Sequence, residues 1–310
     1  MSGAGVDVIY IAASARDGRF ARTCVASVRH FYPEVPIRVL VGGPLEHGLA
    51  DELTGHWDVR LADLPPRDYG WGFVKLEPLF RPPGERFLVL DADTVMTGPV
   101  LDVAKASDAD MIVDDERQDE ASARRLYFEW GKPDPDGRPI QQPDFLFNTG
   151  QWFGRSGVIR RDDFAGLVDW GGAKPMLVNP QVFKNGDQGV LNHVANRLAR
   201  EGRLRVDRTP LLCWPGHGLQ GVTVDAIVAR TAPARVIHWA GFKGARHGRL
   251  PGGEVLMYFE RLYYAPLGGN TRRRLATLRH ATAYGVRRFR DRVQLRLSMT
   301  LARRARTGAG

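Results

Sequence analysis

Two carboxylates stand one residue apart directly after an apolar run, in the stretch FLVLDADTVM at Phe87–Met96. Side chains at positions i and i+2 of a strand point to the same face, so Asp91 and Asp93 can converge on one site. Two anions this close repel each other, and burying them is costly unless a cation compensates. Mg²⁺ and Mn²⁺ prefer such oxygen ligands and often share them with substrate phosphates. The pattern therefore predicts a divalent-cation site, with two aspartates that cap a following helix as the alternative.

The same pair is compatible with two classes of enzyme. Metal-dependent glycosyltransferases of the GT-A fold place an Asp-x-Asp motif after a buried strand. Phosphatases of the haloacid dehalogenase type begin with an apolar strand and Asp-x-Asp-x-[Thr/Val], which residues 91–95 satisfy. In that class Asp91 would be the nucleophile and Asp93 a general acid. The sequence has no late acidic pair of the phosphatase type, and the motif, which normally opens such a domain, begins only at residue 91.

Four sequence blocks resemble glycosyltransferase family 8, the family of glycogenin and of bacterial lipopolysaccharide galactosyl- and glucosyltransferases. The first is Phe73–Met96, in which a helix carrying a lysine before a leucine precedes the strand and its Asp-x-Asp motif. The others follow in family order: FNTG at Phe147–Gly150, GDQGVLN at Gly186–Asn192 and HWAGFK at His238–Lys243. Each block alone is a weak signal, but four in order are specific, and together they span roughly residues 7–245.

The resemblance implies a GT-A fold and transfer of a sugar from a UDP-sugar donor. It assigns the metal ligands to Asp91, Asp93 and His238, with Mn²⁺ (or Mg²⁺) as the ion and diphosphate oxygens completing the coordination. The ion would neutralise the charge that develops on the β-phosphate as the diphosphate leaves. The family retains the anomeric configuration, so an α-linked donor would give an α-linked product.

The same match implies which residues surround the donor. Lys75 would reach the donor sugar or diphosphate, and Gly241 would let the backbone approach the phosphates. Lys243 would pair with the phosphates as a point charge. The last block departs from the family pattern, because its lysine comes one residue early and Gly244 occupies the usual lysine position. Arg246 is therefore the alternative partner of the diphosphate.

Three further residues are implied in the transfer itself. Asn148 would line the pocket near the sugar and the acceptor, while Asp187 and Gln188 would lie near the anomeric carbon. In the family the latter two are alternative candidates for stabilising an oxocarbenium-like transition state or acting as nucleophile. Asp187 could also be an ordinary N-cap of the helix that follows. The family's acidic cluster after its first strand, which contacts the base and ribose, corresponds here to the stretch from Ala12 to Asp17.

Alternating strands and helices must position these residues. Apolar, β-rich runs predict strands at residues 8–13, 37–41, 59–61, 87–90, 145–153 and 236–239. Helical periodicity and helix breakers predict helices at residues 20–32, 71–80 and 187–200. This alternation is typical of an α/β protein with a mostly parallel, doubly wound sheet, in which ligands bind beyond the carboxyl ends of the strands. Asp91 and Asp93 lie at such an end.

One segment interrupts the alternation. Residues 114–144 begin acidic, pass through a stretch at 121–130 that could form a helix, and end rich in proline, glycine and aspartate. Long excursions of this kind are often lids or binding loops, so we expect this one to help select the acceptor. The transferase domain is expected to span residues 1–265.

Bulk composition narrows the class of protein. The chain of 310 residues is long enough for one large α/β domain, and its two cysteines, Cys24 and Cys213, are too far apart for a Cys-x-x-Cys metal site. The N-terminal residues are typical of a first strand and not of a signal peptide, and no apolar run approaches the roughly 18–20 residues of a membrane span. We therefore expect a cytoplasmic protein whose membrane contact, if present, is peripheral.

The positive charge is concentrated at the C-terminal end. Residues 271–310 carry twelve arginines and one aspartate, whereas the whole chain has a net charge of +9, so the remainder is close to neutral. Apolar residues recur at steps of three and four from Val286 to Leu301 among the arginines, which predicts a basic amphipathic helix of roughly 20 residues. Such helices bind anionic membrane surfaces; a helix docked on the protein body is the alternative. No aromatic platform accompanies the charge, so no nucleic-acid partner is expected.

Together these features predict a retaining, metal-dependent transferase that moves a hexose from a UDP-sugar to a glycan or lipid-linked acceptor. The basic tail suggests that it works in the synthesis of lipopolysaccharide or another envelope glycan, on the inner face of a bacterial plasma membrane. Two alternatives stay open: a phosphatase that acts through Asp91 and Asp93, and a catalytically silent, membrane-associated protein that binds sugar nucleotides.

Overall fold

A seven-stranded sheet forms the centre of the protein, in a computed structural model that describes residues 5–70, 72–216, 219–243, 245–279 and 282. Its strands are β1 (Val8–Ala13), β2 (Ile37–Val41), β3 (Val59–Leu61), β4 (Arg86–Asp91), β6 (Met111–Asp114), β7 (Gln151–Arg155) and β10 (Val206–Thr209). Their order is β10-β6-β7-β4-β1-β2-β3, and β7 is the antiparallel member among these described strands. The prediction of an α/β fold with a mostly parallel sheet is confirmed.

A smaller sheet continues from the end of β4. It consists of β11 (Leu212–Cys213), β12 (Val236–His238) and β5 (Thr94–Met96), in that order, with β12 and β5 antiparallel. A separate pair joins β8 (Val168–Asp169) to β9 (Met176–Leu177). The chain therefore passes from the large sheet to the small one through Ala92 and Asp93, directly after the last residue of β4.

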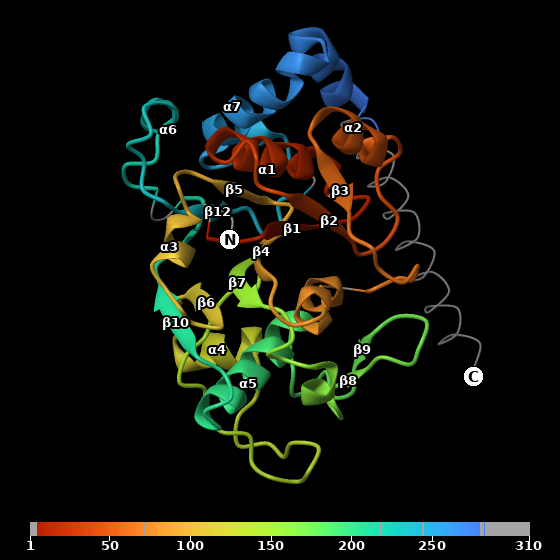
Figure 1. Cartoon of the computed structure of the whole chain (residues 1–310), viewed down its shortest axis with the longest axis vertical. Helices are drawn as coiled ribbons and strands as arrows, with labels where there is room; N and C mark the ends of the chain where they lie inside the picture. The colour runs from red at the N-terminus through yellow and green to blue at the C-terminus, as the bar shows by residue number, and fades with distance from the viewer. Residues whose placement is uncertain (1–4, 71, 217–218, 244, 280–281, 283–310) are drawn as a thin grey trace, which may run out of the picture.

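Helices cover both faces of the large sheet. The α-helices are α1 (Gly18–Phe31), α2 (Leu49–His56), α3 (Asp102–Lys105), α4 (Glu120–Leu126), α5 (Asp187–Arg200), α6 (Val224–Val228) and α7 (Gly253–Tyr264). Four 3₁₀ helices are η1 (Phe73–Phe80), η2 (Arg161–Phe164), η3 (His247–Arg249) and η4 (Ala265–Leu267). Figure 1 shows α1, α2 and α7 on one side of the sheet and α4, α5 and η1 on the other. None of the described helices has the length and apolar character of a membrane span.

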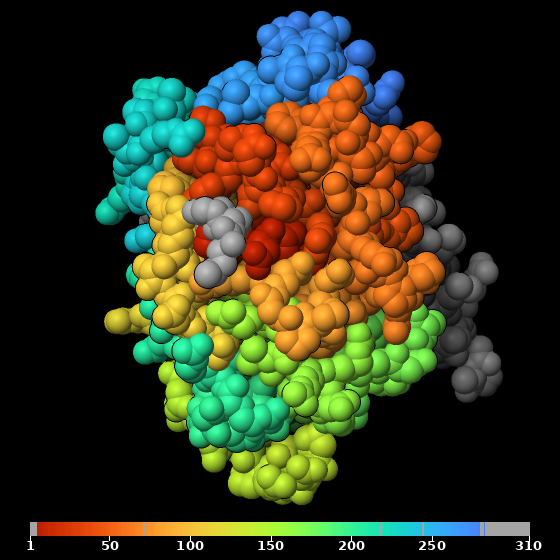
Figure 2. Space-filling model, in the orientation of Figure 1, coloured from red at the N-terminus to blue at the C-terminus, as the bar shows by residue number. Residues whose placement is uncertain are grey.

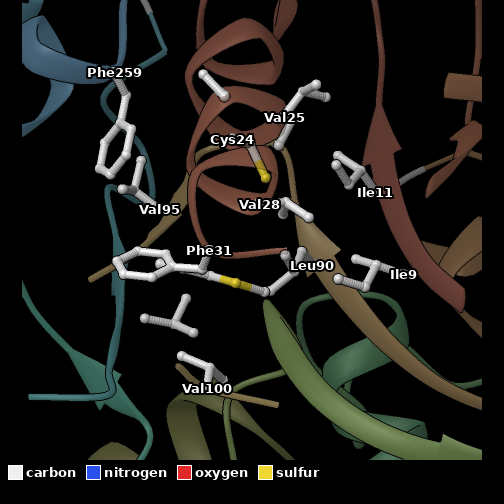
Figure 3. Close-up of a cluster of buried hydrophobic side chains, with 14 of the residues drawn as sticks. Ile9, Ile11, Cys24, Val25, Val28, Phe31, Leu90, Val95, Val100 and Phe259 are labelled. Atoms are coloured by element: carbon white, nitrogen blue, oxygen red, sulfur yellow. The ribbon is translucent and has the colours of Figure 1, made fainter. Parts of the chain in front are cut away.

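The central strand β4 is buried on both faces. Leu88 and Leu90 pack against α1, whose residue Cys24 lies above the strand end (Figure 3), whereas Phe87 and Val89 belong to the cluster on the opposite face. Burial on both faces explains why the sequence of β4 is a continuous apolar run and not an alternation. The core thus holds β4 rigidly up to the point where Asp91 begins the polar site.

The predicted strand at residues 145–153 is wrong in its first half, because β7 begins only at Gln151. The backbone of Phe147 instead exchanges two hydrogen bonds with the side chain of Asn192, at 2.9 Å each. Phe145 pairs in the same way with Asn196 on the next turn of α5. Side-chain amides therefore replace a neighbouring strand here, which no strand pattern in the sequence reveals.

The predicted helix at residues 71–80 is the 3₁₀ helix η1, and it begins after Gly72, whose φ of 83° is left-handed. Pro78 lacks the N–H that a continuous α-helix would need at this position. The possible helix at 121–130 is shorter, as α4, and lies within the excursion. The space-filling view places that excursion at the opposite end of the molecule from α7 (Figure 2).

The C-terminal tail is described only in its first part. Residues 269–279 are helical, but the amphipathic helix predicted from Val286 to Leu301 lies outside the described residues. The domain boundary at residue 265 stays a prediction.

Replacing Leu90 by alanine tests the role of β4 as the rigid support. Leu90 is fully buried, so Leu90→Ala should lower the free energy of unfolding by about 2–5 kcal/mol. Leu61→Ala is the matched control, because Leu61 is 43% exposed and should change stability by less than about 0.5 kcal/mol. Urea unfolding followed by circular dichroism measures both, and equal losses would contradict this account of the core.

His193 predicts a dependence of stability on pH. His193 lies on α5, and its ring packs against Phe128 and Phe183. Burial, assisted by the charge of Arg197, lowers the pKa of His193 to about 4. The unfolded chain binds the proton near pH 6.5, so stability should fall as the pH drops from about 6.5 towards 4, by on the order of 2 kcal/mol. Urea unfolding across this range should show a smaller slope for His193→Gln, while the exposed control His56→Gln keeps the wild-type slope. Equal slopes for the two variants would refute the assignment.

Candidate metal centre and active site

The ends of β4 and β12 bring three possible metal ligands together. His238 is paired with Thr94 across the small sheet, and its Nε2 lies 3.2 Å from Asp93 Oδ1 and 3.7 Å from Asp91 Oδ2. One ligand atom from each of the three residues lies within 4.8 Å of the others. The strand β5, not a helix, follows the two aspartates, so the helix-capping alternative is wrong. Two carboxylates and an imidazole suit a divalent cation of the Mn²⁺ class.

The side chain of Asn148 determines which nitrogen of His238 carries the proton. Its Oδ1 accepts from the backbone N–H of Gly150 at 2.8 Å, and its Nδ2 donates to Gln188 Oε1 at 3.2 Å, so the amide orientation is fixed. His238 Nδ1 lies 3.1 Å from the same Oδ1 and must therefore donate to it. The Nε2 lone pair of a neutral imidazole then faces two carboxylates. That arrangement is stable only with a proton or a cation at Nε2, and a divalent cation satisfies all three ligands at once.

Lys243 lies on the open side of the same cluster. Its Nζ is 2.7 Å from Asp17 Oδ1, while Asp17 Oδ2 accepts from the backbone N–H and the hydroxyl of Ser14 at 2.8 and 2.7 Å. Burial lowers the pKa of Lys243, but the charges of Asp93 and Asp17 outweigh it and raise that pKa overall. Burial likewise opposes the charge of Asp93, yet His238 and Lys243 hold the pKa of Asp93 below its usual range. Lys243 therefore lies beside the candidate metal ligands, whereas Arg246 lines a separate cavity beside α7.

Lys75 connects two acidic residues beneath the site. It is 5% exposed, and its Nζ lies 3.2 Å from Asp91 Oδ1 and 3.0 Å from Asp187 Oδ2. The same Nζ donates to the carbonyl and the hydroxyl of Thr149, both at 3.2 Å. Burial lowers the pKa of Lys75, but the two carboxylates raise it, so the lysine stays charged. The structure brings Lys75 into the cluster of site residues and not to a solvent-exposed surface.

Asp187 does not cap α5. It is the first residue of that helix, Gly186 is the N-cap, and no side-chain cap hydrogen bond forms. Its carboxylate points to Lys75, because Gly72 leaves room: a Cβ at Gly72 would lie 1.7 Å from Asp187 Oδ1. Burial raises the pKa of Asp187, and Lys75 opposes that shift. Gly72, which precedes η1 in a left-handed conformation, thus leaves space for the carboxylate of Asp187 from α5.

Gln188 is held on both ends of its amide. Its Oε1 accepts from Asn148, and its Nε2 donates to the carbonyl of Leu126 at 3.1 Å, at the end of α4. The predicted transfer residues Asn148, Asp187 and Gln188 therefore form one hydrogen-bonded group with the metal ligands and the excursion.

Ala12 and Gly241, two residues predicted at the donor site, have small or no side chains, so mainly their backbone atoms are available there. Ala12 on β1 is paired with Asp91, and its carbonyl accepts from the N–H of Ala92 at 3.0 Å. Gly241 follows β12 with a φ of 84° and has open space where a Cβ would stand. Glycine is required at 241 by its backbone conformation, and the open space leaves the backbone accessible.

Sequence reasoning missed two side chains at this site. The ring of Trp214, after β11, stacks on His238 with centroids 5.5 Å apart and planes 19° apart. Glu116, in the excursion, accepts from Tyr127 Oη and from Gln118 Nε2. Burial raises the pKa of Glu116, and its hydrogen bonds with Tyr127 and Gln118 act in the opposite direction. Only the aromatic-Pro-Gly turn at Trp214 and the acidic start of the excursion could have indicated them.

Removing the amide that orients His238 should weaken metal binding. Asn148→Ala frees the imidazole to rotate and change tautomer, so the affinity for Mn²⁺ should fall about 10- to 100-fold. Isothermal titration with Mn²⁺ measures this, and the exposed Asn270→Ala is the control that should bind like wild type. Equal affinities of the two variants would contradict the orienting role.

Neither a family model nor a curated protein matches the sequence, but solved structures match the fold. The galactosyltransferase LgtC in complex with donor and acceptor sugar analogues has a TM-score of 0.55 and 18% identity, over 83% of this chain and 95% of LgtC. An active-site mutant of LgtC gives 0.54 and 15%, over 81% of this chain and 94% of the mutant. The bifunctional glycosyltransferase WbbM gives 0.51 and 14%, over 82% of this chain and 49% of WbbM.

At these identities the likeness concerns the fold. It extends over 81–83% of this chain. The chain therefore has the fold of the GT-A glycosyltransferases, and its structural neighbours support the resemblance to family 8.

Proposed function

We propose that this chain is a metal-dependent, retaining glycosyltransferase that moves a hexose from a UDP-sugar to a glycan or lipid-linked envelope acceptor. The observation that carries the proposal is the ligand set of Asp91, Asp93 and His238, flanked by Lys75 and Lys243, at the carboxyl end of β4 in a GT-A fold. Mn²⁺ or Mg²⁺ bound there would act as a Lewis acid on the diphosphate of the donor.

The residues of this chain would bind and orient the donor around that centre. Lys243 can leave Asp17 and pair with a phosphate, because its side chain is 43% exposed. Asp91 is the partly exposed ligand, so substrate oxygens can approach from its side. The open backbone at Gly241 provides room for the diphosphate. We assign Asp17, together with the end of β1 at Ala12, to the nucleoside part of the donor, with uridine as the base that the family resemblance implies.

The transfer step would depend on Asp187, Gln188 and Asn148. Asp187 is 2% exposed and paired with Lys75, which makes it a poor nucleophile towards a sugar. The amide of Gln188 is less buried and held by Asn148, so its oxygen is the better candidate for stabilising positive charge at the anomeric carbon. We therefore assign Gln188 to the sugar and Asp187 to the positioning of Lys75.

The acceptor side of the proposed site is formed by the excursion. Glu116 in the excursion accepts a hydrogen bond from the buried Tyr127, and Trp214 stacks on His238. Sugars bind well to an aromatic face with carboxyl groups nearby, because the apolar side of the ring stacks while hydroxyls donate. These side chains support a glycan acceptor.

Two alternatives are less well supported. A phosphatase would need Asp91 as a free nucleophile, but Asp91 is paired with Lys75 and shares its site with His238. A catalytically silent nucleotide-binding protein would bind UDP-sugars with the metal and never turn them over.

For the location of the protein, we propose peripheral attachment to the inner face of the plasma membrane through residues 271–310, since Leu275 and Leu278 are 52% and 64% exposed in the described part of that tail.

Thermal stability with UDP, GDP, ADP and CMP, each with and without Mn²⁺, tests the donor site. UDP at 100 times its dissociation constant should add about 2.7 kcal/mol of stability, only with Mn²⁺ and only while Asp93 is intact. Asp93→Asn should abolish this shift, and the matched surface variant Asp102→Asn, whose side chain is 56% exposed, should keep it.

The outcomes separate the three functions. No response to any nucleotide from folded wild-type protein would overturn the transferase proposal and direct attention to phosphomonoesters. A metal-dependent UDP response without release of UDP from any UDP-sugar in the presence of glycan acceptors would favour the silent binding protein.

A further inference from the structure

Two asparagines on α5, Asn192 and Asn196, hold the segment of chain that leads into the active site. They lie on successive turns of the helix and are 0% and 2% exposed. Each side chain binds both backbone groups of one residue before β7: Asn192 binds Phe147, and Asn196 binds Phe145. In both, Nδ2 also donates to the carbonyl four residues earlier on α5, at 2.9 Å. The two amides thus make the same kind of connection one helical turn apart.

Asn192 differs from Asn196 in the residues that its hydrogen bonds reach. Its Nδ2 donates to the carbonyls of Phe147 and Gln188, and its Oδ1 accepts from the N–H of Phe147, each at 2.9 Å. Phe147 directly precedes Asn148, and Asn148 Nδ2 donates to Gln188 Oε1 at 3.2 Å. One buried side chain therefore fixes the backbone next to Asn148 and the backbone of Gln188, its hydrogen-bond partner.

These contacts close a ring of hydrogen bonds beside the metal centre. The ring runs from Asn192 through the backbone of Phe147 to Asn148, across to the side chain of Gln188, and back along one turn of α5 to Asn192. Hydrogen bonds in a buried network support one another, so the loss of one member affects the others. Asn148 Oδ1 also lies 3.1 Å from His238 Nδ1, so the ring is connected to a candidate metal ligand.

The contacts of Asn192 require an asparagine. The two hydrogens on its Nδ2 serve two carbonyls while Oδ1 serves an N–H, so one short side chain supplies both kinds of group. Aspartate lacks the donors, and alanine would leave the N–H and the carbonyl of Phe147 without these partners. Phe147 is fully buried, so such unpaired groups would be costly, and its backbone would shift towards new partners. A shift of that kind would carry Asn148 with it.

We propose that Asn192 is a positioning residue of the active site, which sets the placement of Asn148 and Gln188 relative to each other. The inference rests on the proposed function, in which Gln188 lies at the anomeric carbon while Asn148 orients His238. None of the hydrogen bonds of Asn192 in the described structure reaches a metal ligand, so it acts only through the two residues that it holds. Asn196 makes its contacts further from the site and serves the fold alone.

Asn192→Ala and Asn196→Ala in the full-length protein form a matched pair that separates positioning from stability. The side chain of Asn196 makes four hydrogen bonds and that of Asn192 three, so urea unfolding should show at least as large a loss of stability for Asn196→Ala. The order should reverse at the metal centre. Isothermal titration with Mn²⁺ should show an affinity about tenfold lower for Asn192→Ala, because it loosens the contact that orients His238, and a wild-type affinity for Asn196→Ala.

Turnover at saturating Mn²⁺ gives a second measurement, with release of UDP from UDP-glucose and UDP-galactose as the probe. Asn192→Ala should lower kcat about 10- to 100-fold and change KM for the donor much less, because a misplaced Gln188 loses its effect in the transition state. If the alanine variant does not fold, Asn192→Asp and Asn196→Asp replace the pair, since aspartate keeps the size of the side chain and lacks the donors.

Equal Mn²⁺ affinities of the two variants, or losses of affinity and rate that follow the losses of stability, overturn the proposal. The Mn²⁺ titration does not depend on turnover, so it tests the positioning role of Asn192 even if the wild type shows no response to UDP. Failure of the proposed function is thus distinct from failure of this inference.

Discussion

The convergence of carboxylates at the end of β4 is the constraint on which the rest of the structure depends. Asp93 and Asp187 are buried beside the partly exposed Asp91, and the buried carboxylates must be compensated by cations or by donors. Lys75 serves two of them from below, while Lys243 and His238 act from the side of β12. His238 and Lys243 thus favour the charged form of Asp93, which is the form that metal coordination requires.

That electrostatic arrangement recruits elements far apart in the chain. Lys75 comes from η1, His238 from the small sheet and Asp187 from the start of α5. Asn148 then links the imidazole to Gln188, and Gln188 links α5 to the end of α4 in the excursion. Three hydrogen bonds therefore connect the candidate metal ligand His238 to the end of α4 in the excursion.

Basic residues lie in two separate regions of this molecule. Two of the six lysines, Lys75 and Lys243, lie at the carboxylate cluster, where a compact point charge fits between acids. Arginines of α1, η3 and the helix at 269–279 line a cavity beside α7, where Arg19 is paired with Glu260. The excess charge of the C-terminal region is therefore not only a tail property, because its first arginines are built into the folded body.

The sequence by itself determined the sheet class, the order of the strands along the chain and the chemical identity of the centre. Apolar runs predict buried strands, and two carboxylates directly after such a run predict a metal site, to which only the family resemblance adds His238. Tertiary structure alone decided that Lys75 is buried between Asp91 and Asp187, that Asp187 is not a cap, and that Trp214 stacks on His238. The physical reason is that pairing of buried charges and stacking of rings depend on distances across the fold, whereas periodicity reports only which residues avoid water. The cavity beside α7 shows the same limit, since Arg19 and Arg273 are far apart in the chain and line one cavity only once α1, α7 and the C-terminal helix are assembled.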